Sequence, residues 1–178
     1  MTTTDTQNLA TTPRRDRLSR RQRQAVLVLH IVSAVGWIGV DFALLPLVIT
    51  GLTTDDGATA AAAYRAVAIF VPWTVPALSL LIVSTGVLLG LGTKWGLIRY
   101  WWVTVKLVIS LILLTLVFVS LLPAVRGLEV TTATTGDEVR AALGDPTMFL
   151  YPPVVSSLAL ITAVVLSVKK PWSRRGAR

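Results

Sequence analysis

Long apolar stretches alternate with short polar ones along this chain. Four of the apolar stretches reach about 20 residues, the length that a helix rising 1.5 Å per residue needs to cross a hydrocarbon core about 30 Å thick. These four stretches cover residues 25–49, 67–91, 101–122 and 148–168. The pattern predicts an all-α fold. The membrane domain should cover residues 25–168 and form a bundle of four transmembrane helices.

Polar, basic segments flank this domain at residues 1–24 and 169–178. The first of them is rich in Thr near its start and shows no apolar periodicity, so we expect a disordered tail. Between the third and fourth stretches, helix cap signals are given by Thr135, Asp137, Glu138 and Arg140, followed by Gly144. We therefore expect a short amphipathic helix in that connection, lying on the membrane surface.

The composition strengthens the membrane assignment. Of the 178 residues, 53% are hydrophobic and 15% are charged, and the mean hydropathy is +0.69, which indicates lipid as the main partner. The chain has no Cys, which excludes disulfides, thiolate metal sites and cysteine nucleophiles. No nucleotide-binding loop, nucleophile elbow or paired zinc-ligand motif is present. Whether the protein is an enzyme is left open by the sequence.

The distribution of basic residues predicts an orientation. Thirteen of the 17 Lys and Arg residues lie in the two tails and in the connection between the second and third stretches. The other two connections carry only Arg65, Arg126 and Arg140. Cytoplasmic loops retain positive charge, so both termini are predicted to be cytoplasmic. The net charge of +8 does not indicate nucleic acid, because the basic residues flank apolar runs and form no face with interleaved aromatics.

Three ionisable residues interrupt the apolar stretches: His30 and Asp41 in the first and Lys106 in the third. His30, Trp37 and Asp41 are spaced to share one helix face, which should point into the bundle because an ionisable group in lipid is costly. His30 and Lys106 are each the sixth residue of their stretch, so both should lie roughly 7 to 8 Å below the cytoplasmic boundary. Each of these residues also has a purely structural interpretation. His30 would be a hydrogen-bonded imidazole and Trp37 a core-filling indole. Asp41 would be a carboxylate near loop water, and Lys106 an ammonium that snorkels to the headgroups.

Two short segments resemble a known superfamily. Leu29–Gly39, with the sequence LHIVSAVGWIG, is similar to the first-helix signature of the superfamily that contains the copper-resistance D membrane domain and the haem-pathway membrane protoporphyrinogen oxidase. Tyr100–Lys106, with the sequence YWWVTVK, resembles its second signature. From about Ala25 to Val168 the chain looks like an uncharacterised actinobacterial branch of integral membrane proteins. The resemblance implies a multi-pass protein of the bacterial inner (plasma) membrane, with His30 as a b-type haem ligand and Lys106 as a functional residue.

The leading hypothesis is a cytoplasmic-side pocket, lined by His30, Trp37 and Lys106, that binds haem b or a porphyrin-like anion. Lys106 would pair with a propionate or a similar group. Copper handling is disfavoured, because the chain has one His and only two Met residues. A haem iron would be held by His30 alone or by two copies of His30 across a homodimer.

Two other hypotheses remain open. Gly39 and Ala43 in the first stretch, and Gly86 and Gly90 in the second, have the small-xxx-small spacing of helix contacts. They favour a non-catalytic protein that assembles with itself or with a membrane partner. The third hypothesis is a small transporter subunit in which Asp41 and His30 are proton-linked groups.

Overall fold

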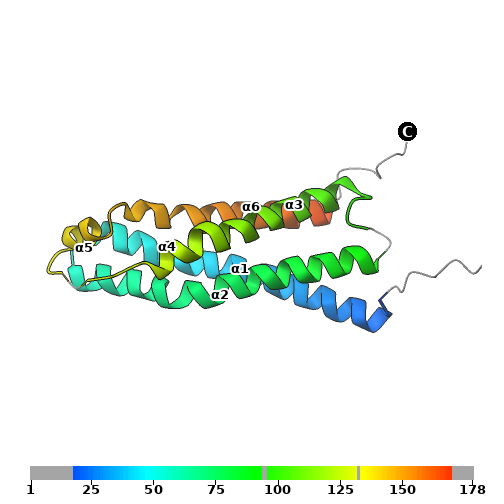
Figure 1. Ribbon diagram of the computed structural model, residues 1–178, viewed down its shortest axis with the longest axis horizontal. Helices are drawn as coiled ribbons and strands as arrows, with labels where there is room; N and C mark the ends of the chain where they lie inside the picture. Colours follow the sequence, from blue (N-terminus) through cyan, green and yellow to red (C-terminus); the bar gives the residue numbers. More distant parts are fainter. Residues whose placement is uncertain (1–17, 94–95, 132, 170–178) are drawn as a thin grey trace, which may run out of the picture.

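The computed structural model describes residues 18–93, 96–131 and 133–169, and in this part of the chain every regular element is a helix. The long helices are α1 (Arg20–Thr53), α2 (Gly57–Gly92), α3 (Trp101–Leu116) and α6 (Tyr151–Lys169). The third span continues through a π-helical segment, η1 (Val117–Leu121), into α4 (Leu122–Arg126). Four helical spans are long and apolar enough to cross a membrane, and they lie side by side (Figure 1). The predicted all-α, four-span fold class is confirmed.

α1 begins earlier than the sequence analysis predicted. Residues 20–24 were assigned to a disordered tail, but they form the first turns of α1. Ser19 and Gln22 explain the difference, because Ser19 Oγ accepts a hydrogen bond from the Gln22 N–H and Gln22 Oε1 accepts one from the Ser19 N–H, at 3.3 and 3.0 Å. This capping box satisfies backbone donors at the start of the helix. The other predicted tail residues, 1–17 and 170–178, lie outside the described part of the chain.

α2 also extends well beyond its predicted start at Val67. Its first residue is Gly57, and the segment between them is rich in Ala, the best helix former. Asp56 caps this end, since its Oδ2 accepts a hydrogen bond of 2.8 Å from the Thr59 N–H. The connection between α1 and α2 is consequently very short.

The third span is interrupted by the π-helical segment η1. The backbone N–H of Leu122 bonds to the carbonyl of Val117, five residues earlier. Pro123 follows directly, and a proline has no N–H and clashes with the carbonyl four residues before it, here that of Val119. The wider π turn accommodates Pro123 without ending the span.

A short helix, α5 (Gly136–Ala142), and a 3₁₀ turn, η2 (Pro146–Phe149), lie between α4 and α6. Thr135 and Glu138, two of the predicted cap signals, form a capping box at the start of α5. α5 is tied to the neighbouring helix ends, because the Gly136 N–H donates to the Asp55 carbonyl at 2.7 Å and the Arg140 guanidinium donates to the Thr54 carbonyl at 2.8 Å. We call this the α5 end of the bundle, and the opposite end, where α1 begins and α6 finishes, the terminal end (Figure 1).

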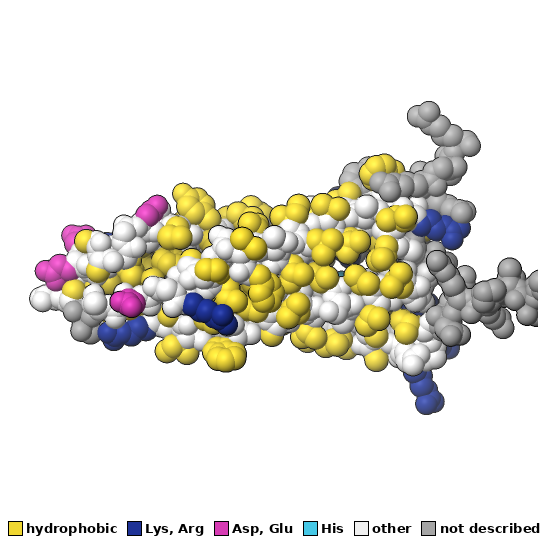
Figure 2. All heavy atoms as spheres, in the orientation of Figure 1, with side chains coloured by type: hydrophobic (Ala, Val, Ile, Leu, Met, Phe, Trp, Pro, Cys, Tyr) yellow, Lys and Arg dark blue, Asp and Glu magenta, His cyan; other side chains and the backbone are white. Residues whose placement is uncertain are grey.

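The surface of the bundle is apolar along its length. Figure 2 shows hydrophobic side chains over the long helices, with acidic side chains gathered at the α5 end. Large apolar residues such as Trp73 and Val119 are exposed. Exposed apolar surface of this extent requires lipid or a partner to cover it. The structure thus fits a multi-pass integral membrane protein in a lipid bilayer.

Candidate functional site

Of the cavities that the described residues form, two contain an ionisable residue of α1. The larger one, the histidine cavity, has a volume of about 610 Å³ and lies at the terminal end between α1, α2, α3 and α6. Its polar lining includes His30, Lys106, Arg23 and Ser167. The smaller one, the aspartate cavity, has a volume of about 200 Å³ and is lined by Asp41 together with mostly apolar side chains.

His30 is held by Thr85 of α2. His30 Nδ1 lies 2.9 Å from Thr85 Oγ1, and the Thr85 hydroxyl donates its own proton to the backbone carbonyl of Leu81. Thr85 Oγ1 also lies 3.2 Å from the Ile82 carbonyl. With its single proton on a backbone carbonyl, Thr85 Oγ1 accepts from His30, and this contact fits the tautomer that carries its hydrogen on Nδ1. In the neutral imidazole, Nε2 then keeps its lone pair. A metal-binding histidine is arranged in the same way, with one ring nitrogen hydrogen-bonded and the other free.

Lys106 enters the histidine cavity from α3. Its Nζ donates a hydrogen bond of 2.5 Å to Ser167 Oγ of α6 and lies 6.0 Å from the centroid of the Trp102 ring. The Ser167 hydroxyl in turn donates to the Ala163 carbonyl at 3.0 Å. Lys106 and His30 are close enough to interact electrostatically across the cavity. The two residues that the sequence placed at one depth therefore line one cavity.

Among the described residues, those that line the histidine cavity include two cations and no acidic side chain. The two cations are Arg23 of α1 and Lys106. The only ion pair within the described residues joins Arg140 to Asp137 at the α5 end. Most of the remaining lining is aliphatic, including Leu27, Ile82 and Leu107. Such walls suit an apolar ligand body, and the two cations suit one or more anionic groups.

Trp37 and Asp41 lie in the aspartate cavity and not with His30. Both side chains are buried on the inward face of α1, as the shared-face prediction required. Trp37 does not line the histidine cavity, because it sits seven residues beyond His30, about 10 Å further along the helix axis. The predicted trio of His30, Trp37 and Lys106 is therefore brought together only in part. His30 and Asp41, the two groups of the transporter hypothesis, are likewise in separate cavities.

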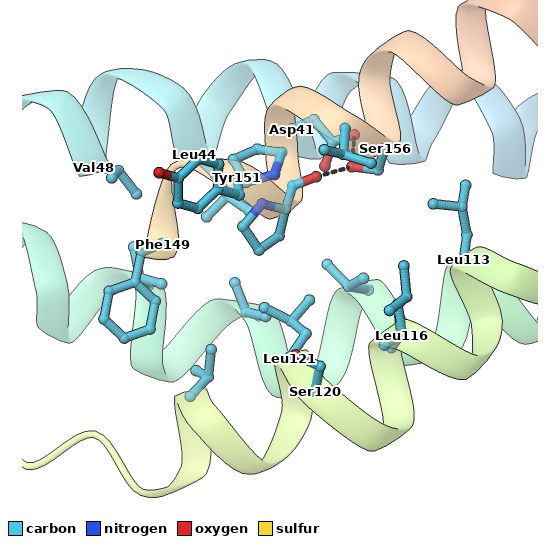
Figure 3. Close-up of a pocket in the computed structure, with 18 of the residues that line it drawn as sticks. Asp41, Leu44, Val48, Leu113, Leu116, Ser120, Leu121, Phe149, Tyr151 and Ser156 are labelled. Carbon is cyan, nitrogen blue, oxygen red and sulfur yellow. Dashed lines mark hydrogen bonds between the residues drawn. The ribbon is translucent and has the colours of Figure 1, made fainter. Parts of the chain in front are cut away.

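Asp41 is bound by two serines of α6, of which Figure 3 shows Ser156. Its Oδ2 accepts hydrogen bonds from Ser156 Oγ at 2.7 Å and from Ser157 Oγ at 3.2 Å. The Trp37 indole N–H, one turn earlier on α1, is close enough to the Asp41 carboxylate to interact with it electrostatically. It does not reach hydrogen-bonding geometry with any described acceptor. Asp41 is thus a buried carboxylate held by neutral groups.

The two small-residue pairs differ in their surroundings. A Cβ added to Gly86 would lie 3.4 Å from His30 Cε1, and one added to Gly90 would lie 2.3 Å from Leu97 Cδ2. This pair therefore packs inside the chain, beside the histidine cavity. A Cβ added to Gly39 would meet nothing within 4 Å, and Ala43 is exposed. The predicted contact at Gly39 is not made within this chain, because Gly39 is about 200° around α1 from the buried Trp37.

The hydroxyl partners of the ionisable residues were not predicted from the sequence. Thr85, Ser156, Ser157 and Ser167 hold the three ionisable residues, yet they lie in spans chosen only for hydropathy. The one available signal was the adjacent Ser156 and Ser157 pair in an otherwise apolar stretch. Arg23 was also missed as a lining residue, because it was placed in the tail.

Comparison with protein-family models, with curated proteins and with solved structures gave no match. Within the described residues, no group of three or more His, Cys, Asp or Glu side chains could hold a metal ion. Any function must therefore be argued from the two cavities themselves.

Proposed function

We propose that this membrane protein binds a b-type haem, or a closely related anionic porphyrin, in the histidine cavity. The observation that carries the proposal is the position of His30 in this cavity, with its Nδ1 2.9 Å from Thr85 Oγ1, a contact that fits the tautomer with a lone pair on Nε2. A single neutral imidazole of this kind is the usual protein ligand to haem iron.

The rest of the cavity supports the same ligand. Its volume of about 610 Å³ lies within the range of about 300–1,000 Å³ that is typical of cofactor and ligand sites. Lys106 and Arg23 provide cations for carboxylates, and both are near the terminal end of the bundle. The aliphatic walls exclude water from an apolar ring. When bound, haem would supply a redox-active iron, and the residues of this chain would ligate, orient and neutralise it.

The test is spectroscopic. Protein purified in detergent from a haem-replete host should show a Soret band, or acquire one when haem is titrated into the colourless protein. The absorption and spin state of the iron would also separate one His30 ligand, which gives a five-coordinate iron, from two His30 ligands across a homodimer. A protein that carries no haem and takes none up contradicts the proposal.

We further propose that both termini are cytoplasmic in the bacterial inner membrane, so that the histidine cavity lies on the cytoplasmic side. The support is the concentration of Lys and Arg in the segments at the terminal end. A reporter fused after Arg178 should be active in the cytoplasm, and one inserted after Glu129 should report from the opposite side. The reverse result would place the cavity on the outer side.

A second proposal is non-catalytic assembly with a second copy or a membrane partner through the Gly39 and Ala43 face of α1. It is supported by the empty space beside Gly39, since close approach between helices in lipid uses small residues. Gly39→Leu should then reduce crosslinking between copies or with the partner in membranes. Gly86→Leu would serve as the comparison, because Gly86 already faces His30 of the same chain.

A further inference from the structure

The aspartate cavity has no role in the proposed haem site. Its ionisable side chain is acidic, whereas the histidine cavity is lined by basic ones. Asp41 is only 2% exposed, and it forms no ion pair with any of the residues that the structure describes. A buried charge without a partner is strongly unfavourable, so such a group is normally neutralised by a proton or by a cation. The cavity beside Asp41 offers space for the second of these.

One carboxylate oxygen is left for a ligand. Both serine hydrogen bonds go to Oδ2. No described donor bonds to Oδ1, and this atom is not among the fully buried polar atoms that lack a partner. Because Asp41 lines the cavity, Oδ1 is the carboxylate oxygen that a ligand there would contact. Among the described lining residues, Asp41 has the only side-chain carboxylate.

The remainder of the cavity is apolar and partly aromatic. Valines of α2 and η1, including Val71 and Val117, form its walls, and Trp37 and Phe149 add aromatic rings. Figure 3 shows Phe149 at one side of the cavity. Aromatic faces attract organic cations, above all quaternary ammonium groups. A metal ion would find too few oxygen ligands for its hydration shell to be replaced.

The exposed lining residues show how a ligand would enter. Leu116 of α3 is 47% exposed, and Tyr151 and Val155 of α6 are 65% and 49% exposed. All three belong to spans that are apolar enough to lie in the bilayer. The side of the cavity between α3 and α6 therefore faces lipid, which favours a ligand that partitions into the membrane.

We propose that the aspartate cavity is a binding site for a small lipophilic ammonium ion, with its charge beside Asp41 Oδ1 and its apolar part among the valines of α2 and η1. The volume of about 200 Å³ limits the ligand to a compact amine or quaternary ammonium ion. This proposal uses none of the residues of the histidine cavity, so it stands or falls independently of haem binding.

The first experiment measures equilibrium dialysis of radiolabelled benzyltrimethylammonium against the full-length protein in lipid nanodiscs. Wild type should bind the ion saturably. Asp41→Asn keeps the side-chain shape and removes the charge, so the affinity should fall about a hundredfold, as expected when one partner of a buried charge pair is removed. Asp55→Asn is the matched control at an exposed carboxylate. Equal binding by wild type and Asp41→Asn, or no binding by wild type, overturns the proposal.

The second experiment needs no variant and so survives if Asp41→Asn fails to fold. Neopentylbenzene has the shape of benzyltrimethylammonium with carbon in place of the charged nitrogen. Thermal unfolding of wild type should shift upward with the ammonium ion and not with the neutral hydrocarbon. An equal shift with both compounds would show that the cavity selects shape alone, which overturns the role assigned to Asp41.

Discussion

The two ends of the bundle differ in how their polar and charged groups are paired. At the α5 end the backbone groups of the helix ends are satisfied from within: Arg140 donates to carbonyls at the end of α1 and Asp56 caps α2. At the terminal end the helices separate around a cavity of about 610 Å³, whose cations Lys106 and Arg23 lack carboxylate partners in the described chain. The comparison indicates that polar contacts fasten the helices at the α5 end, whereas the terminal end has the cavity in which we propose that haem binds.

The largest expected effect belongs to the terminal end. His30→Ala should abolish the Soret absorption, because no other imidazole exists in the chain and the ligand to iron is lost. The thermal midpoint of the apoprotein should change little, since the four spans and their backbone hydrogen bonds remain. Absorption spectra and thermal unfolding of the same preparation check both statements. Retention of a normal Soret band by His30→Ala would exclude this residue as the ligand.

Substitutions of Lys106 test the proposed contact between its ammonium group and an anionic group of haem. Lys106→Gln removes the charge and should weaken haem retention about tenfold, a loss in the usual range for one charge-assisted contact. Lys106→Arg should keep most of the affinity if the charge alone matters. Both variants should keep the position of the Soret band, which depends on the iron ligand. Haem titration followed by absorbance gives the affinities.

The next effect belongs to the α5 end. A Cβ on Gly136 would lie 2.0 Å from the Thr54 carbonyl oxygen, so Gly136→Val must displace α5 from the end of α1. We expect a loss of about 3 kcal/mol in the free energy of unfolding, the upper range for overpacking. Gly127→Val is the matched control, because Gly127 is exposed and the nearest atom to its Cβ position, the Pro123 carbonyl oxygen, is 3.4 Å away. If chemical denaturation shows similar losses in the free energy of unfolding for both variants, α5 does not stabilise the α5 end of the bundle.

Packing at the histidine cavity should give a somewhat smaller loss. Gly86→Leu places a side chain where a Cβ is already 3.4 Å from His30 Cε1, and we expect about 2 kcal/mol of destabilisation together with weaker haem binding. Leu88 is 48% exposed, so Leu88→Ala should be milder. Thermal stability in detergent compares the two. A neutral Gly86→Leu beside a damaging Leu88→Ala would reverse our assignment of the inward face of α2.

Arg140 should contribute less, because it acts at a helix end near water. Arg140→Met removes the hydrogen bonds to the Gly51 and Thr54 carbonyls, at 3.2 and 2.8 Å, and a positive charge near the end of α1. We expect a loss of about 1 kcal/mol. Arg140→Lys keeps the charge and should lose less. Urea denaturation of the three proteins would show whether this side chain stabilises the α5 end at all.

The smallest effect is a pH dependence at the start of α2. The hydrogen bonds from the Thr59 side chain and backbone lower the pKa of Asp56 below its ordinary value of 3.8. A carboxylate with a lowered pKa in the folded state stabilises the protein above the unfolded pKa, and this contribution disappears as the pH falls through the folded value. The difference in thermal midpoint between wild type and Asp56→Asn should therefore be constant near neutral pH and shrink below about pH 4. Asn is also a good cap, so only the charge is tested.

The spans and the short helix α5 were predictable because each has a local cause. Hydropathy alone marks a span of about 20 residues, and the Thr135 and Glu138 spacing specifies the cap of α5. The extra length of α2 was not predictable from hydropathy, since its Ala-rich start before Val67 is less apolar. Helix propensity and the Asp56 cap decide that boundary.

The candidate sites were predictable only in part, for a geometrical reason. Periodicity along α1 places His30, Trp37 and Asp41 on one face, but it does not say which helix faces each of them. Thr85 and Ser167 come from other helices, and a hydroxyl in a helix can bond to its own backbone and leave no trace in the pattern. Depth along α1 then separates Trp37 from His30 into two cavities.

The π-helical turn at Val117–Leu121 sets how the two halves of the third span face the bundle. A π turn is equivalent to one residue inserted into an α-helix, and one residue corresponds to a rotation of about 100°. Deleting a single residue there would leave the composition almost unchanged but would rotate one half of the span relative to the other. Leu113 and Val125 line the aspartate cavity from the two sides of the turn, and after such a deletion they would no longer face it together.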